Sequence, residues 1–200
     1  MSYPKVNAPY GFHPLNRLDG MPYAGATRFF KIASGYDTDL LNGDLVEIGP
    51  DGVIQKFTGT DSGNPVGVFM GCEFVSPVMK TPVWAEQWPA NTVDDNAMAY
   101  VVDDPNAVFK VAVTDGSGAM ASVQRNAIGS NMAIVQGEGS TITGDSAVSV
   151  LAGSEATTAT LPVRVVDIVP ATAYASNGNT VYPEVIVKIN THQYNNPTGV

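Results

Sequence analysis

The sequence predicts a mainly β protein, built as a single β-barrel or sandwich domain with one short helix and an extended N-terminal arm. Only 14% of the 200 residues are charged, while 20 are Gly and 14 are Pro. Such a composition is typical of short strands joined by tight turns rather than of a helical bundle. Short apolar runs separated by turn residues recur from position 28 onward. We therefore expect an extended anchoring arm over residues 1–28 and a β-rich domain over residues 29–200.

The N-terminal segment combines backbone breakers with aromatic side chains. Pro or Gly occupies positions 4, 9, 11, 14, 20, 22 and 25, so neither a helix nor a long strand ladder can propagate there. Disordered tails are usually poor in aromatic residues, whereas this segment contains several. We expect it to lie along its own domain or along a neighbouring subunit, and its removal to leave a folded body. The predicted partner-binding residues are Tyr10, Phe12, His13, Arg17 and Tyr23.

Charge is unevenly distributed along the chain. Overall 10 Lys and Arg oppose 19 Asp and Glu, a net charge of −9, which argues against nucleic-acid binding because that affinity depends on cations meeting phosphates. Residues 1–31 are the exception, with four basic groups against Asp19 alone. A basic leader on an acidic body could dock on an acidic partner, although so few charges could also be distributed by chance.

The strand predictions rest on apolar runs and on the turns between them. The predicted strands are 29–32, 45–48, 53–57, 65–74, 97–102, 108–113, 132–135, 147–151, 161–169 and 181–189. The turn 49–52, Gly-Pro-Asp-Gly, predicts a hairpin, and an acidic turn follows at 103–106. Gly67 and Gly71 indicate a bulge or a close backbone approach within their strand.

Alternation in the last strand indicates that one of its sides is buried. Val185, Val187 and Ile189 share one side, while Glu184 and Lys188 share the other. The only helix prediction covers 119–128, where apolar residues follow a helical spacing, with Ser117 before it and Gly129 after it. Segments 136–146 and 152–160 are expected to be surface loops or thin edge strands.

Residues suited to catalysis or metal binding do not form a recognisable pattern. The two histidines, His13 and His192, lie near opposite ends of the chain without ligand-like spacing to other donors. The acidic pairs 94–95 and 103–104 lack the spaced ligands of a calcium loop. We therefore expect no enzymatic activity, no cofactor and no metal. Trp84 and Trp88 lie four residues apart with apolar neighbours, which favours a role in an interface or in core packing.

The single cysteine excludes an internal disulfide framework. Cys72 lies in an apolar run, so we expect it to be a buried small hydrophobe. The prolines near the start interrupt any signal-peptide core, and no stretch is long enough to form a membrane helix. The expectation is a protein made in a reducing cytoplasm, without a membrane partner.

Six segments resemble the small structural proteins of tailed bacteriophages that decorate and cement capsids. These segments are 8–14, 20–26, 101–105, 108–111, 161–166 and 187–193. The resemblance implies a β-barrel or tulip-like fold, homotrimers, and the major capsid protein as partner. It also implies synthesis in the host bacterial cytoplasm and a final location on the virion's capsid surface, where the protein holds the shell against internal pressure.

A second hypothesis is a non-catalytic β-rich binding module for a carbohydrate or a cell-surface ligand. In that case Trp84 and Trp88, together with the Asp-rich loops, would form the binding platform.

Overall fold

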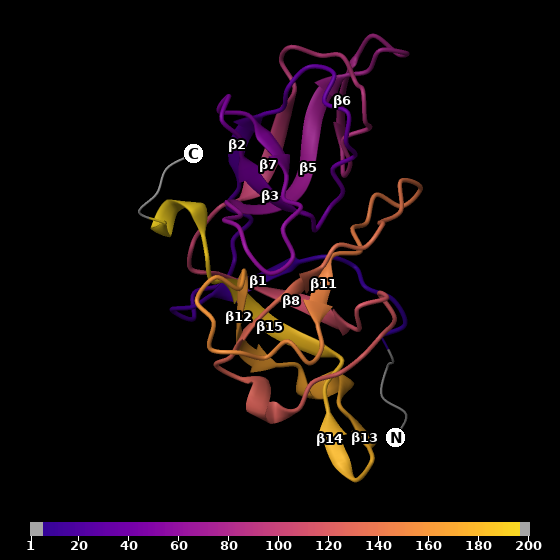
Figure 1. Cartoon of the computed structure of the whole chain (residues 1–200). Coiled ribbons are helices and arrows are strands. Elements are labelled where there is room, and N and C mark those ends of the chain that lie inside the picture. The colour runs from indigo at the N-terminus through magenta and orange to yellow at the C-terminus, as the bar shows by residue number, and fades with distance from the viewer. Residues whose placement is uncertain (1–5, 197–200) are drawn as a thin grey trace.

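The computed structural model describes residues 6–196 and is mainly β, with 40% of residues in strands and 5% in helical turns. This confirms the predicted fold class. A nearly closed, barrel-like sheet is present, and the arrangement also fits a sandwich-like fold. Two main sheets lie one above the other in Figure 1, with a small hairpin below them.

The lower sheet in Figure 1 has seven strands, centred on β8 (Ala107–Thr114) and β15 (Glu184–Ile189). Its other strands are β1 (His13–Arg17), β9 (Asn131–Met132), β10 (Ile134–Val135), β11 (Ser149–Leu151) and β12 (Val163–Ile168). The strand order is β10-β11-β8-β15-β12-β9, and β1 also pairs with β8. The β11–β8 pair is parallel and the other pairs are antiparallel.

The upper sheet has six strands and is antiparallel throughout. Its strands are β2 (Arg28–Lys31), β3 (Leu45–Ile48), β4 (Ile54–Lys56), β5 (Gly67–Val75), β6 (Pro82–Ala85) and β7 (Met98–Val102). The order is β2-β7-β5-β3-β4, with β6 also paired to β5. A separate two-stranded sheet is formed by β13 (Tyr174–Ser176) and β14 (Asn179–Val181).

Two hydrophobic clusters form the interior, and the first of them includes residues from both main sheets. The first surrounds Phe12 and Phe109 in the lower sheet, and the second surrounds Phe69 and Trp88 in the upper sheet. The strands β7 and β8 follow one another in sequence but belong to different sheets. The acidic turn 103–106 is therefore the crossover between the sheets.

The turn and glycine predictions in the upper sheet are confirmed. The turn 49–52 joins β3 to β4 in an antiparallel hairpin. Within this turn, the Gly52 amide donates to the Gly49 carbonyl at 2.9 Å. At Gly71, φ is +149° and the pairing with β7 shifts register, as expected for a bulge. A Cβ atom on Gly67 would lie 2.2 Å from the Val102 carbonyl oxygen, so the two backbones meet too closely for any side chain.

The predicted helix over 119–128 is reduced to one 3₁₀ turn, η1 (Arg125–Ala127). Two isolated β-bridges keep the residues before this turn extended. One pairs Met120 with Thr114, and the other pairs Val123 with Tyr182. The backbone groups that a helix would pair internally are thus bonded to neighbouring strands. The other helical turns are η2 (Pro170–Thr172) and η3 (Gln193–Asn195).

The segment expected to be an arm lies along the protein's own domain, which is one of the two placements expected for it. Residues 1–5 lie outside the described part of the chain. Phe12 is fully buried, and its ring meets that of Phe109 edge-on with centroids 6.2 Å apart. The following residues form β1 on β8, with a register shift after Pro14. Proline is tolerated because Pro14 lies near the start of β1, whose one partner strand in the sheet is β8.

Candidate functional site

The side of the upper sheet that faces away from its core is the leading candidate surface. Strand alternation places Phe74 and Ala99 in the second core and turns their neighbours the other way. Phe29 lies opposite Tyr100, and Glu73 lies opposite both Met98 and Trp84. We call this surface the outer face; its residues are Phe29, Glu73, Val75, Trp84, Met98 and Tyr100.

Aromatic side chains dominate the outer face. Trp84 is 68% exposed and Phe29 is 57% exposed. The rings of Phe29 and Tyr100 meet edge-on with centroids 5.0 Å apart, and the Tyr100 hydroxyl donates to the Glu73 carboxylate at 2.9 Å. Desolvation and then this carboxylate raise the pKa of Tyr100, while the Trp84 indole opposes them. The phenol is therefore a fixed neutral donor beside the exposed indole.

An apolar outer face is unusual for an antiparallel sheet, whose solvent side normally carries polar residues. The turn between β5 and β6 also exposes two apolar side chains, Val78 and Met79. In Figure 1 this turn lies at the end of the upper sheet that points away from the lower sheet. Contiguous exposed apolar groups of this kind mark binding surfaces.

The two tryptophans predicted as interface residues have different environments. Trp84 lies on the edge strand β6 and is exposed, so its role in an interface stays a prediction. Trp88 is fully buried, packs edge-on against Phe74 at 5.5 Å, and its indole donates to the Tyr36 carbonyl at 3.4 Å. Trp88 is a core residue and cannot contact a ligand or a partner at the surface.

Tyr10 from the predicted arm contacts the body of the protein. Its hydroxyl donates to the Glu184 carboxylate, and the Lys110 ammonium lies over its ring, 5.2 Å from the centroid. The same ammonium is 3.3 Å from Glu184. Burial and then the Glu184 carboxylate raise the pKa of Tyr10. Glu184 was expected to face solvent but is 3% exposed, because the Tyr10 segment covers that side of β15.

Two basic residues of the leader, Arg17 and Arg28, pair with the chain's own acidic crossover. Arg17 Nε lies 2.9 Å from Asp104, and Arg28 Nε lies 3.0 Å from Asp103. Tyr194 from η3 completes the group by donating to Asp103 at 3.1 Å. These cations already have intramolecular partners, which weakens the hypothesis that the leader docks on a foreign acidic surface.

The remaining arm residues also face the protein itself. Phe12 is in the first core, so it is unavailable as a surface contact. His13 is half-buried, and its ring lies 5.1 Å from that of Tyr10. Tyr23 packs against the first core, and burial raises its pKa. The residues that leave apolar area exposed in this segment are instead Leu15, Leu18 and Met21.

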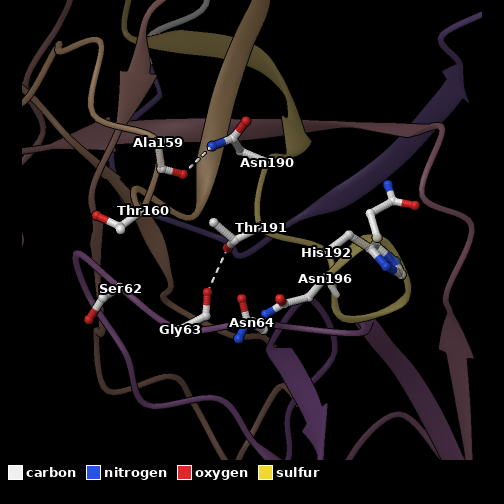
Figure 2. A pocket seen from close by; sticks show the side chains of 10 residues that line it. Ser62, Gly63, Asn64, Ala159, Thr160, Asn190, Thr191, His192 and Asn196 are labelled. Atoms are coloured by element: carbon white, nitrogen blue, oxygen red, sulfur yellow. Dashed lines mark hydrogen bonds between the residues drawn. The ribbon is translucent and has the colours of Figure 1, made fainter. Parts of the chain in front are cut away.

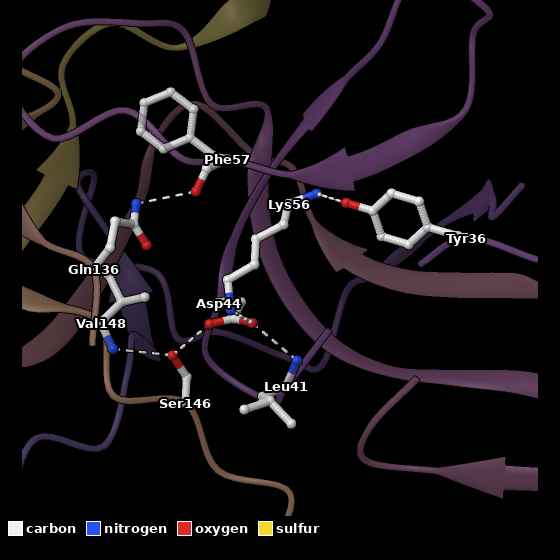
Figure 3. A network of polar contacts seen from close by, with 8 residues as sticks. All are labelled: Tyr36, Leu41, Asp44, Lys56, Phe57, Gln136, Ser146 and Val148. Carbon is white, nitrogen blue, oxygen red and sulfur yellow. Dashed lines mark hydrogen bonds and ion pairs between the residues drawn. The ribbon is translucent and has the colours of Figure 1, made fainter. Parts of the chain in front are cut away.

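A buried polar network links the two sheets (Figure 3). The Asp44 carboxylate, fully buried, lies 3.0 Å from the Lys56 ammonium. It also accepts hydrogen bonds from the Leu41 amide at 2.9 Å and the Ser146 hydroxyl at 2.6 Å. The Ser146 oxygen in turn accepts from the Val148 amide at 3.1 Å. Every oxygen of this carboxylate has a partner, so the network has a structural role.

A pocket of about 400 Å³ lies where three distant segments meet, 62–64, 159–160 and 190–196 (Figure 2). Its lining contains amides and hydroxyls but no Asp, Glu, Lys or Arg. Two hydrogen bonds brace the walls, from Asn190 to the Ala159 carbonyl at 3.0 Å and from Thr191 to the Gly63 carbonyl at 2.6 Å. The lining therefore offers no acidic or strongly basic side chain to an ionic ligand.

His192 contributes to the lining of this pocket and is almost completely buried. Its Nδ1 accepts a hydrogen bond from the Tyr194 amide at 3.2 Å. Burial lowers the pKa of His192, and the nearby Asp103 and Asp104 partly oppose that effect. The imidazole is therefore a neutral structural group at neutral pH.

The thiol of Cys72 has the environment that the sequence predicts. It is fully buried, donates to the Gln87 carbonyl at 3.2 Å, and burial raises its pKa to about 12. Within residues 6–196, no group of three or more His, Cys, Asp or Glu side chains is placed to hold a metal ion. The same residues include no helix long and apolar enough to cross a membrane.

No protein-family model matches this chain, and no curated protein or solved structure matches it either. Fold and surface together describe a mainly β protein with an aromatic, solvent-facing side on one sheet. The outer face could be found from sequence only in part. Trp84 was singled out by its apolar neighbours, whereas Phe29, Glu73 and Tyr100 were not, because strand pairing alone brings them together.

Proposed function

We propose that this protein is a structural component of a phage virion that binds the outer surface of the capsid and stabilises the shell as a cement protein. The observation that supports it best is the exposed aromatic outer face on a rigid sheet. The resemblance of six segments to capsid decoration proteins supports it independently. The partner is the major capsid protein, and the role requires no catalysis.

The outer face offers enough apolar area to anchor a subunit. Burying each of Phe29, Val75 and Trp84 would contribute about 1.5–3 kcal/mol. Little conformational entropy is lost because these side chains already stand on paired strands. A homotrimer would engage three such faces at once, and linked contacts raise the apparent affinity without any new interaction.

The N-terminal segment contributes in a different way from that expected of a free arm. Its turn presents Leu18 and Met21 to solvent, both exposed, while Phe12 is buried in the first core. We propose that this turn forms a second, smaller apolar contact with the capsid.

The decisive experiment is cosedimentation with capsids that lack the native protein. Trp84→Ser should abolish or strongly weaken decoration, because it removes the largest exposed side chain of the outer face. The matched control is Tyr174→Ser, which removes an exposed aromatic from β13 outside the outer face and should decorate normally. Circular dichroism should show both variants folded. Normal decoration by Trp84→Ser would overturn the assignment of the outer face.

Self-association is tested by sedimentation of the full chain over a range of concentrations. We expect a trimer in solution or on the capsid. A monomer under every condition, including on the capsid, would contradict the homotrimer.

One observation favours a second candidate function, a carbohydrate-binding module. The exposed indole of Trp84 lies beside the hydrogen-bonded pair of Tyr100 and Glu73, and sugars stack on aromatic rings while their hydroxyls bond to such polar groups. Glycan-array binding that is lost in Trp84→Ser, together with unchanged capsid decoration, would support this alternative. Trp88 has no part in it because it is buried.

A further inference from the structure

The chain contains two Asn-Gly pairs, and the fold places them in opposite surroundings. Asn177 and Gly178 form the two-residue turn between β13 and β14, with φ of +49° and +80°, and both are exposed. Asn42 and Gly43 lie in the junction between the sheets, where the Gly43 amide donates to the Phe69 carbonyl at 2.8 Å.

We propose that Asn177 is a site of spontaneous deamidation and that Asn42 is protected. The deprotonated backbone nitrogen of Gly178 attacks Cγ of Asn177. A new N–Cγ bond forms, the bond from Cγ to the side-chain nitrogen breaks, and ammonia leaves with the displaced proton. Water then opens the resulting succinimide at either carbonyl, which yields aspartate or isoaspartate. No oxidant or further reactant is required.

The surroundings of Asn177 allow this attack. Gly178 has no side chain to shield its nitrogen, and an added Cβ would meet no atom within 4 Å. The hairpin is a separate two-stranded sheet, and isolated hairpins of this kind are only marginally stable. Local opening therefore releases the turn from its tight geometry and lets Cγ approach the nitrogen.

The surroundings of Asn42 oppose the same reaction. The backbone nitrogen of Gly43 donates to the Phe69 carbonyl, and the backbone nitrogen of Asn42 donates to the Gly144 carbonyl at 2.8 Å. A Cβ on Gly43 would lie 3.0 Å from the Gly11 Cα atom, so the backbone is tightly enclosed. Attack would require the junction between the sheets to open, which costs far more than opening the hairpin.

Each product changes the hairpin. Aspartate adds one negative charge to a chain that is already at −9. Isoaspartate also adds a methylene to the main chain of a two-residue turn, which disturbs the pairing of Tyr174 with Val181. The hairpin tip therefore acquires charge and structural heterogeneity with age.

The test is peptide mapping by mass spectrometry after the full-length protein has been incubated at mildly alkaline pH. In the folded protein, conversion at Asn177 should exceed conversion at Asn42 by on the order of ten-fold or more. In denaturant the two sites should convert at similar rates, because the junction no longer protects Gly43. Asn177→Gln should remove most of the conversion in the folded protein, since glutamine closes the corresponding ring much more slowly. Equal rates in the folded protein, or faster conversion at Asn42, would overturn the proposal.

Discussion

The hydroxyl of Ser146 donates a 2.6 Å hydrogen bond to the buried carboxylate of Asp44, joining the loop before β11 to the turn before β3. The contact links the lower sheet to the upper one. A second link lies in η3, where the Gln193 side chain accepts from the Ile48 amide at 3.0 Å and donates to the Ile48 carbonyl at 3.1 Å. Polar contacts therefore help to hold the two hydrophobic clusters together.

The first prediction concerns this junction. Asp44→Ala should lower the free energy of unfolding by about 3 kcal/mol, because it leaves the Lys56 ammonium and the Ser146 hydroxyl without their buried partner. The measurement is urea denaturation. Asp95→Ala, at an exposed carboxylate, is the control and should change stability by less than about 0.5 kcal/mol. Equal effects of the two variants would show that the network does not stabilise the fold.

The second prediction separates the core role of the N-terminal segment from a surface role. Phe12→Ala should cost about 3–5 kcal/mol, because it opens a cavity in the first core. Phe29→Ala removes the same side chain from an exposed position and should cost less than about 1 kcal/mol. Chemical denaturation of both variants checks this. We also expect removal of residues 1–26 to prevent stable folding, since it deletes Phe12 and β1. A truncated protein with full stability would contradict this assignment.

The third prediction tests the close approach of two backbones in the upper sheet. Gly67→Ala should destabilise the protein by at least about 1–3 kcal/mol, because the new methyl group would overlap the Val102 carbonyl. Gly116→Ala places the same group in open space and should leave stability unchanged within about 0.5 kcal/mol. Thermal unfolding of both variants measures the difference. A neutral Gly67→Ala would mean that the two strands can separate at little cost.

The fourth prediction concerns acid sensitivity at His192. Its folded-state pKa is lowered by burial from an ordinary value of 6.5. Above that value the imidazole is neutral in both states. As the pH falls from 6.5 toward the folded-state pKa, the unfolded chain binds a proton that the folded chain excludes. The free energy of unfolding should therefore decrease across this window.

Urea denaturation at several pH values measures this decrease, and the two histidines provide a matched comparison. His192→Asn should remove this part of the pH dependence, whereas His13→Asn should retain it. The same pH dependence in wild type and His192→Asn would assign it to other groups, such as the carboxylates.

The local features of the fold follow from the sequence by itself. Alternation in 185–189 predicts which side of β15 is buried. The three apolar residues on that side, Val185, Val187 and Ile189, are indeed buried. The turn at 49–52 and the bulge at Gly71 are predicted because proline restricts φ and glycine permits unusual φ values. These signals depend only on neighbouring residues, so they can be interpreted without knowing what each strand packs against.

Tertiary structure alone decided which strands pair and what covers each of their sides. Nothing local distinguishes Glu184, buried under Tyr10, from Lys188 on the same side of β15. Likewise, Trp84 and Trp88 have similar neighbours, yet one faces solvent and the other fills a core. The crossover at 103–106 could have been a hairpin turn but instead divides the strands between two sheets. Sequence periodicity specifies that a strand has two sides, whereas contacts between residues far apart in the chain determine what covers each side.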